Sequence, residues 1–217
     1  MTGPVVAESV QNTDINGGAT DNLSITFGTA PAAGQLIVIV AVSPGGETLT
    51  APSGFTTLFG DASSYGVYAK VASGSEGTTL TMGYFNTAGI MFGLRITGAA
   101  TSSPVDASGQ NTGNNASPAV TTTQANDLLF SIAINPSTNV VGTQPSGMTL
   151  LQTANVGEAH GGPISAAIAS ETQATAGTSL ALPWSQSESF AITIAISPAV
   201  ASSKLLLGRR RKNNAAI

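Results

Sequence analysis

The sequence predicts an all-β fold: an antiparallel, jelly-roll-like β-sandwich built from two sequence-similar halves. Apolar residues recur with a period of two in short segments, and clusters of Gly, Pro, Asn and Ser separate these segments at short, regular spacing. Several segments occur a second time, in the same order, later in the chain. No stretch before the C-terminal arm has the capped, amphipathic pattern of a helix. We therefore expect roughly ten to fourteen strands.

Two patterns define the strands. From Leu36 to Val42 the run is continuous and rich in β-branched residues, which predicts a strand covered on both faces. From Ile90 to Thr97 apolar residues alternate with others, which is typical of a strand with one buried face. The other strands expected are Leu23 to Phe27, Tyr65 to Val71, Thr79 to Tyr84, Ala119 to Thr123, Ile164 to Ala169 and Phe190 to Ile196.

The repeated segments indicate a tandem duplication. AGQLIVIVAVSP at 33–44 matches ANDLLFSIAINP at 125–136, and the turn PSGF at 52–55 returns as PSGM at 145–148. Three more pairs keep this order: SVQNT with SGQNT, GTTLTM with GTSLAL, and IMFGLRIT with FAITIAIS. A fixed order along the chain indicates two related halves, residues 4–99 and 103–199.

The two halves are expected to share one domain, residues 1–203, because no charged or flexible linker separates them. Two separate small sandwiches are the alternative. The halves differ most in an insertion at 152–163 and in a basic C-terminal arm, residues 204–217. We expect function where the halves differ rather than in the repeated turn.

Charge is rare and unevenly distributed. The chain has 7 Lys and Arg against 11 Asp and Glu, and charged residues make up 8% of it. Lys70 and Arg95 are the only cations before residue 204. The chain has no cysteine, which excludes disulfides and thiolate metal sites. Its longest apolar run is far shorter than the ~20 residues of a membrane span, so no membrane partner is expected.

The basic arm is the most informative polar segment. Four of its five cations follow a short apolar run, and no acid lies beside them, which is typical of a patch that neutralises phosphates or an acidic protein surface. Nucleic acid is therefore one alternative partner, and a merely solvated tail is another. The residues expected to dock on a partner are Lys204, Leu205, Leu206, Leu207, Arg209, Arg210, Arg211 and Lys212.

No catalytic or metal-binding constellation is evident. The single histidine, His160, is not accompanied by a Gly-x-Ser-x-Gly elbow and is interpreted as a loop residue. Asp14, Asn16 and Asp21 offer oxygen ligands for calcium, but their spacing is not that of an EF-hand, and Asx-turns account for the same residues. We expect no enzyme activity, no metal and no cofactor.

Trp184 is the one candidate for contact with a glycan, because an exposed indole ring can stack on a sugar. The alternating residues Leu180, Leu182 and Trp184 favour the other interpretation, in which the ring packs in the core. The sequence leaves both interpretations open.

Six segments resemble a β-sandwich domain found in virion proteins of tailed bacteriophages and in prophage structural proteins. They are GQLIV at 34–38, APSGF at 51–55, VYAKVASG at 67–74, SPVDASG at 103–109, AVTTT at 119–123 and NDLLF at 126–130. The resemblance covers most of residues 5–198. It implies a virion location and a non-enzymatic structural role, with the major capsid protein or other virion proteins as partners. By analogy the chain would form a homo-oligomer such as a trimer.

Three functional hypotheses follow. The first is a phage head decoration (cement) protein that binds and stabilises the capsid lattice, with a tail or head-fibre component as its variant. The second is a carbohydrate-binding adhesin module. The third, an enzyme that degrades glycans, has only the eleven acids as candidate residues, and no motif selects a pair among them.

Overall fold

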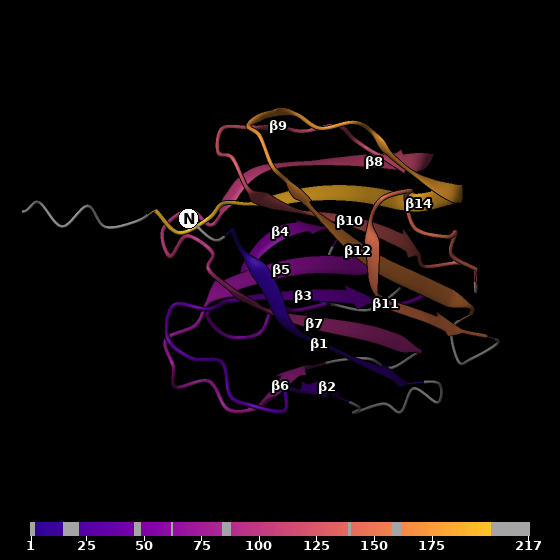
Figure 1. Cartoon of the computed structure of the whole chain (residues 1–217). Helices are drawn as coiled ribbons and strands as arrows, with labels where there is room; N and C mark the ends of the chain where they lie inside the picture. Colours follow the sequence, from indigo (N-terminus) through magenta and orange to yellow (C-terminus); the bar gives the residue numbers. More distant parts are fainter. Residues whose placement is uncertain are drawn as a thin grey trace, which may run out of the picture.

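The computed structural model describes residues 3–14, 22–45, 49–61, 63–83, 88–138, 140–157 and 162–200. These residues form fourteen strands and no helix, and every strand pair is antiparallel. The predicted all-β sandwich is therefore confirmed (Figure 1). No helix in the described part of the chain could cross a membrane.

The first half of the chain forms one large sheet and one small one. The large sheet has the order β1-β7-β3-β5-β4, and the small sheet pairs β2 with β6. The strands are β1 (Val5–Asp14), β2 (Leu23–Thr26), β3 (Leu36–Val42), β4 (Thr56–Gly60), β5 (Tyr65–Val71), β6 (Thr79–Met82) and β7 (Gly89–Thr97).

The second half repeats this arrangement strand for strand. Its large sheet has the order β8-β14-β10-β12-β11, and its small sheet pairs β9 with β13. The duplication inferred from sequence is thus a duplication of topology. The strands are β8 (Val105–Ser117), β9 (Thr121–Thr122), β10 (Asp127–Asn135), β11 (Thr149–Val156), β12 (Ile164–Gln173), β13 (Gly177–Thr178) and β14 (Leu182–Ile196).

One hydrophobic core lies between the two large sheets and takes side chains from both halves. On β3, alternate residues from Leu36 to Val42 enter this core, whereas Ile37 and Ile39 pack on the opposite face with β2 and β6. All seven residues of β3 are 0% exposed, as expected for a strand covered on both faces. Each half is therefore one layer of the shared sandwich, with a two-stranded sheet on its outer side.

Hydrogen bonds close the two long sides of the sandwich. On one side Gln152 Nε2 of β11 donates to Ser9 Oγ of β1 at 2.9 Å. On the other side the Tyr65 hydroxyl of β5 donates to Gln110 Oε1 of β8 at 2.8 Å. The Tyr65 ring also packs against Phe190, with the ring centroids 4.1 Å apart. The two halves are joined by polar contacts at the edges as well as by the core.

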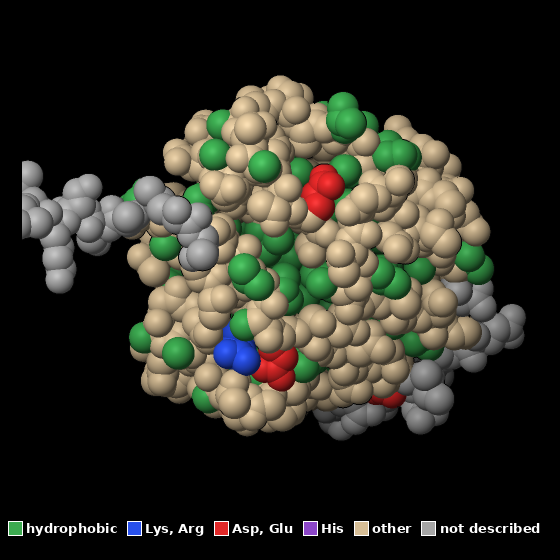
Figure 2. All heavy atoms as spheres, in the orientation of Figure 1, with side chains coloured by type: hydrophobic (Ala, Val, Ile, Leu, Met, Phe, Trp, Pro, Cys, Tyr) green, Lys and Arg blue, Asp and Glu red, His purple; other side chains and the backbone are tan. Residues whose placement is uncertain are grey.

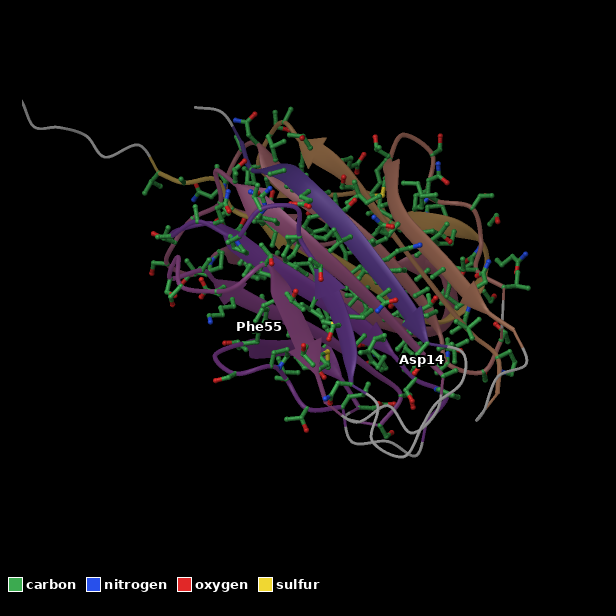
Figure 3. The ribbon with its side chains drawn as sticks, turned by 90° about the horizontal axis from the view of Figure 1, so that it is seen from below. Asp14 and Phe55 are labelled. Carbon is green, nitrogen blue, oxygen red and sulfur yellow. The ribbon has the colours of Figure 1, made fainter. Side chains whose placement is uncertain are left out.

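The repeated Pro-Ser-Gly turn occupies equivalent corners of the two halves. The backbone N–H of Phe55 donates to the carbonyl of Pro52 at 3.0 Å, and that of Met148 donates to Pro145 at 3.2 Å. The glycine between them has a φ of 80° in the first turn and 88° in the second, which fits the third position of a type II turn. The turns lead into β4 and β11, the corresponding edge strands of the two large sheets. Phe55, at the end of the first turn, is labelled in Figure 3.

Both of these edge strands carry an irregularity at the same place. The register of β4 shifts between Thr57 and Phe59, and that of β11 shifts between Leu150 and Gln152. A bulge twists an edge strand and makes it a poorer template for a further strand. The duplication therefore extends to the feature that protects each sheet edge.

Candidate functional site: the terminal corner

The two ends of the described chain meet at one end of the sandwich (Figure 1). Ala99 forms an isolated antiparallel bridge with Pro198, and the Ala199 N–H donates to the Gly98 carbonyl at 2.7 Å. The N-terminal segment is packed on the same place, because a Cβ built on Gly98 would lie 3.0 Å from the carbonyl oxygen of Gly3. We call residues 3–4, 98–104, 124–126 and 197–200 the terminal corner.

The backbone of the terminal corner contains the two non-glycine residues with positive φ in the described chain, Ser103 at 49° and Asn126 at 66°. Asn126 replaces Gly34 of the first half, which has a φ of 83°. Asn tolerates the left-handed region better than most residues, so the positive φ of Asn126 costs little. Serine rarely adopts this conformation. Ser103 lies at the junction between the halves, so the backbone is strained where the second half begins.

A shallow hollow of about 260 Å³ lies in this corner. It is lined by Gln124, Ala125, Asn126, Pro198, Ala199 and Val200. The Val200 side chain is 77% exposed. The corner thus presents an apolar side chain beside the point where the chain continues toward the basic arm.

The eight docking residues expected in the basic arm lie outside the described residues, as do His160, Asn16 and Asp21. Of the expected calcium ligands only Asp14 is described. It ends β1, far from the N-terminal end of that strand (Figure 3).

Trp184 is buried, and its candidate role as a glycan contact is corrected. The side chain is 1% exposed and packs with Leu182 and Met148 on the outer face of the second sheet. Its Nε1–H donates to Ser131 Oγ at 3.0 Å, which satisfies the indole's polar group inside the protein. Leu180, expected to point to the same face, is instead 83% exposed, so the alternation begins at Leu182.

Both cations of the described chain are paired. Lys70 Nζ lies 2.9 Å from Glu76 Oε1, and Arg95 Nη2 lies 2.9 Å from Glu8 Oε2. A hydrogen bond from the Gly28 backbone, together with Arg95, holds the pKa of Glu8 below its usual value. Charged side chains are accordingly sparse on the face shown in Figure 2, where hydrophobic side chains gather between the two layers.

Glu188 is one of two carboxyls that are almost fully buried in the described chain, at 1% exposed. It accepts a hydrogen bond from the Gly142 N–H at 2.8 Å and another from Asn135 Nδ2. Burial raises the pKa of Glu188, and these two donors oppose that effect. The carboxyl holds the segment before β11 against β14, which is a structural task.

Asp127, beside the terminal corner at the start of β10, is the other buried carboxyl and is 0% exposed. No N–H or hydroxyl group of another residue donates to either of its oxygens, and its hydrogen-bonding neighbour is the Asp106 carboxyl. Burial, and then the neighbouring Asp106 carboxyl, raises the pKa of Asp127 to about 7. Asp106 itself accepts hydrogen bonds from Thr123, with the Oγ1–Oδ1 distance 2.6 Å, and from the Gln124 N–H. Both acids lie in the second half of the chain, and the sequence offers no signal that they meet.

Two larger hollows lie elsewhere. One of about 450 Å³ is bounded by β3, β4 and β5 and by residues 103–105, and its lining includes Leu58 and Lys70. The other, of about 530 Å³, lies on the outer side of the second sheet and includes Glu171, Gln173 and Leu180. Within the described chain, no group of three or more His, Cys, Asp or Glu side chains is placed to share a metal ion.

Comparison of the chain with family models, curated proteins and solved structures finds no match.

Proposed function

We propose that the chain is a non-enzymatic structural protein of a tailed-phage particle, a head decoration protein that binds the capsid lattice through its terminal corner and basic arm. One observation carries the proposal: the N-terminal segment packs against the same end of the sandwich to which residues 197–200, which precede the arm, are hydrogen-bonded. Both chain ends can therefore contact one partner surface.

The distribution of charge supports docking through this end. The two cations of the described chain are already paired with carboxylates, so they offer little to an acidic partner. The five cations of residues 204–217 are the remaining positive charge in the sequence. An acidic lattice or a phosphate backbone would attract this arm and leave the acidic body facing outward. On a repeating lattice, many such modest contacts give strong overall attachment.

A carbohydrate-binding adhesin, as part of a tail or head fibre, is the second candidate. With Trp184 buried, the observation that favours it is the hollow of about 530 Å³ on the second sheet. Its lining combines carboxyl, amide and hydroxyl side chains, the groups that hydrogen-bond sugar hydroxyls. These polar groups are Glu171, Gln173, Thr172, Thr175, Thr178, Ser146 and Ser179.

Mass spectrometry of purified particles with absolute quantification tests the proposal and separates the two candidates. A head decoration protein is expected in a copy number that matches the capsid lattice, on the order of hundreds per particle, because it repeats with the lattice. A handful of copies would support the fibre or adhesin candidate. Absence of the chain from particles would contradict both.

A further inference from the structure

The buried side-chain atoms without a hydrogen-bond partner are concentrated at one place in the described chain. Four such atoms occur, and three of them are Asp127 Oδ1, Asp127 Oδ2 and Gln173 Oε1. Asp127 and Gln173 are directly opposite each other in the ladder between β10 and β12. Directly opposite residues point to the same face of a sheet, with Cβ atoms about 5 Å apart. These three acceptor oxygens therefore belong to one cluster.

Asp106 of β8 adds a second carboxylate to this cluster. It is close enough to Asp127 for each to influence the other's ionisation. Thr123 and Gln124 hold Asp106 from the far side, through two backbone N–H groups and one hydroxyl. Asp106 is therefore kept as a carboxylate, and in the hydrogen bond between the two carboxyls the protonated Asp127 is the donor.

Gln173 cannot satisfy Asp127 either, because its amide group is already engaged. Its Nε2 donates to Gly177 O at 2.8 Å and to Thr122 Oγ1 at 3.1 Å. This fixes the amide and leaves its carbonyl oxygen as an unpartnered acceptor. Once Asp127 has lost its proton, the cluster consists of two carboxylates and an amide oxygen, with no donor between them.

Buried acceptors without donors point to an occupant that is itself positive, since native proteins pair nearly all buried polar groups. No cation of the described chain can fill this role, because Lys70 and Arg95 are bonded to Glu76 and Glu8. We propose that Asp106, Asp127 and Gln173 form a binding site for a hard divalent cation, with calcium as the expected ion.

The ligand chemistry favours calcium over other metals. All the available donors are oxygens, and the described chain offers neither nitrogen nor sulfur ligands there, which disfavours zinc and copper. Magnesium requires near-ideal octahedral geometry and retains several waters, whereas calcium tolerates irregular, mixed carboxylate and carbonyl sites. Gln173 also lines the hollow of about 530 Å³, which provides a route for the ion and for waters that complete its coordination.

A cation in this site would stabilise the fold. The site joins the starts of β8 and β10 to the end of β12, directly beside the terminal corner. A cation bound there would stabilise the folded chain by mass action, without any catalytic role. The inference does not depend on the proposed function.

The test uses the full chain, first treated with EDTA and then dialysed, at pH 8, where protons compete least for the carboxylates. Isothermal titration with CaCl₂ is expected to show one site with a Kd on the order of 10⁻⁴ M, typical of sites with few ligands. CaCl₂ at about ten times that Kd should raise the Tm by several degrees, and MgCl₂ should raise it less.

Variants locate the site. Asp127→Asn and Gln173→Ala should each abolish the calcium-dependent rise in Tm. Glu171→Gln, in the adjacent hollow, and Asp14→Asn, at the alternative acidic segment, should leave it intact. Gln173→Ala keeps the test usable if Asp127→Asn does not fold.

Two results would overturn the inference. One is a wild-type chain whose Tm and titration are unchanged by calcium at pH 8, where the carboxyl pair is largely ionised. The other is a calcium response that survives both cluster variants and is lost in Asp14→Asn.

Discussion

Ala99 and Pro198 are bridged although nearly a hundred positions separate them in the sequence. Ala99 ends the first half, and Pro198 lies at the end of the second. The segment that connects the two halves therefore begins beside the end of the second half. The connection between the halves, the N-terminal segment and residues 197–200 consequently share one corner. Duplication of the fold has placed the termini together.

Because the halves share one core, truncating a large core side chain in either half should destabilise the whole sandwich. Phe92 of β7 and Phe130 of β10 are both 0% exposed and both lie in that core. Phe92→Ala and Phe130→Ala are each expected to cost about 3–5 kcal/mol of unfolding free energy. Calorimetry should show a single transition that moves to lower temperature in both variants. Two transitions, of which each variant shifts only one, would mean that the halves fold independently.

The repeated turns should not tolerate a Cβ. Gly147 has a φ of 88° and almost no neighbouring atoms, so its replacement by alanine tests backbone conformation alone. Gly147→Ala is expected to lower the unfolding free energy by about 1 kcal/mol, measured by urea denaturation. Gly77 is the matched control, because it has similar space and its φ does not lie in the left-handed region. Equal effects of the two substitutions would contradict the assigned turn geometry.

Glu76 should stabilise the fold only where it is ionised. Although burial acts to raise it, hydrogen bonds from Ser73 and Lys70 hold the pKa of Glu76 well below its usual value of 4.5. A lowered pKa means that its stabilising effect is present above about pH 4.5 and is lost as the pH falls. Glu76→Gln is therefore expected to cost about 1 kcal/mol at pH 7 and progressively less below pH 4.5.

The control for this pH dependence is Glu171, whose pKa is raised by burial. Its ionisation disfavours the folded state, so Glu171→Gln should gain stability relative to wild type as the pH rises above about 4.5. Urea denaturation from pH 3 to pH 8 measures both trends. Trends of the same sign for the two variants would show that the local environments of these carboxyls are misassigned.

Trp184 should behave as a core residue. Trp184→Phe retains most of the buried ring but loses the hydrogen bond to Ser131, and it leaves a buried hydroxyl with one donor fewer. We expect a loss of about 1–3 kcal/mol in unfolding free energy. The wild-type tryptophan should fluoresce at short wavelength and resist acrylamide quenching. Emission typical of a hydrated indole would contradict its burial.

The strands that the sequence predicted correctly are those with strong apolar patterns, such as β3 and β7. The edge strands β1 and β8 were not expected, because sequences such as VVAESVQNTD bury few side chains and carry little periodicity. They are strands because the neighbouring β7 and β14 supply backbone partners, which is a tertiary effect that no local pattern encodes.

The candidate sites depended still more on tertiary structure. The sequence predicted where each half ends. That these ends meet could be seen only in the structure, where Ala99 after β7 bridges to Pro198 after β14. Asp106 and Asp127 are only moderately separated in sequence, yet they come together because β8 and β10 flank the same strand, β14. Conversely, the interpretation of Trp184 as a core residue was correct, because Leu182 and Trp184 alternate along β14 and lie on the same buried face.

The central claim is that the basic arm, leaving from the terminal corner, attaches the sandwich to a particle. The decisive measurement is rebinding of purified protein to particles that lack it, followed by sedimentation and quantification. We predict that residues 1–203 alone remain folded but fail to bind, that replacing Arg209, Arg210 and Arg211 by Gln weakens binding, and that replacing them by Lys largely preserves it. Full occupancy of particles by the truncated chain would contradict the claim.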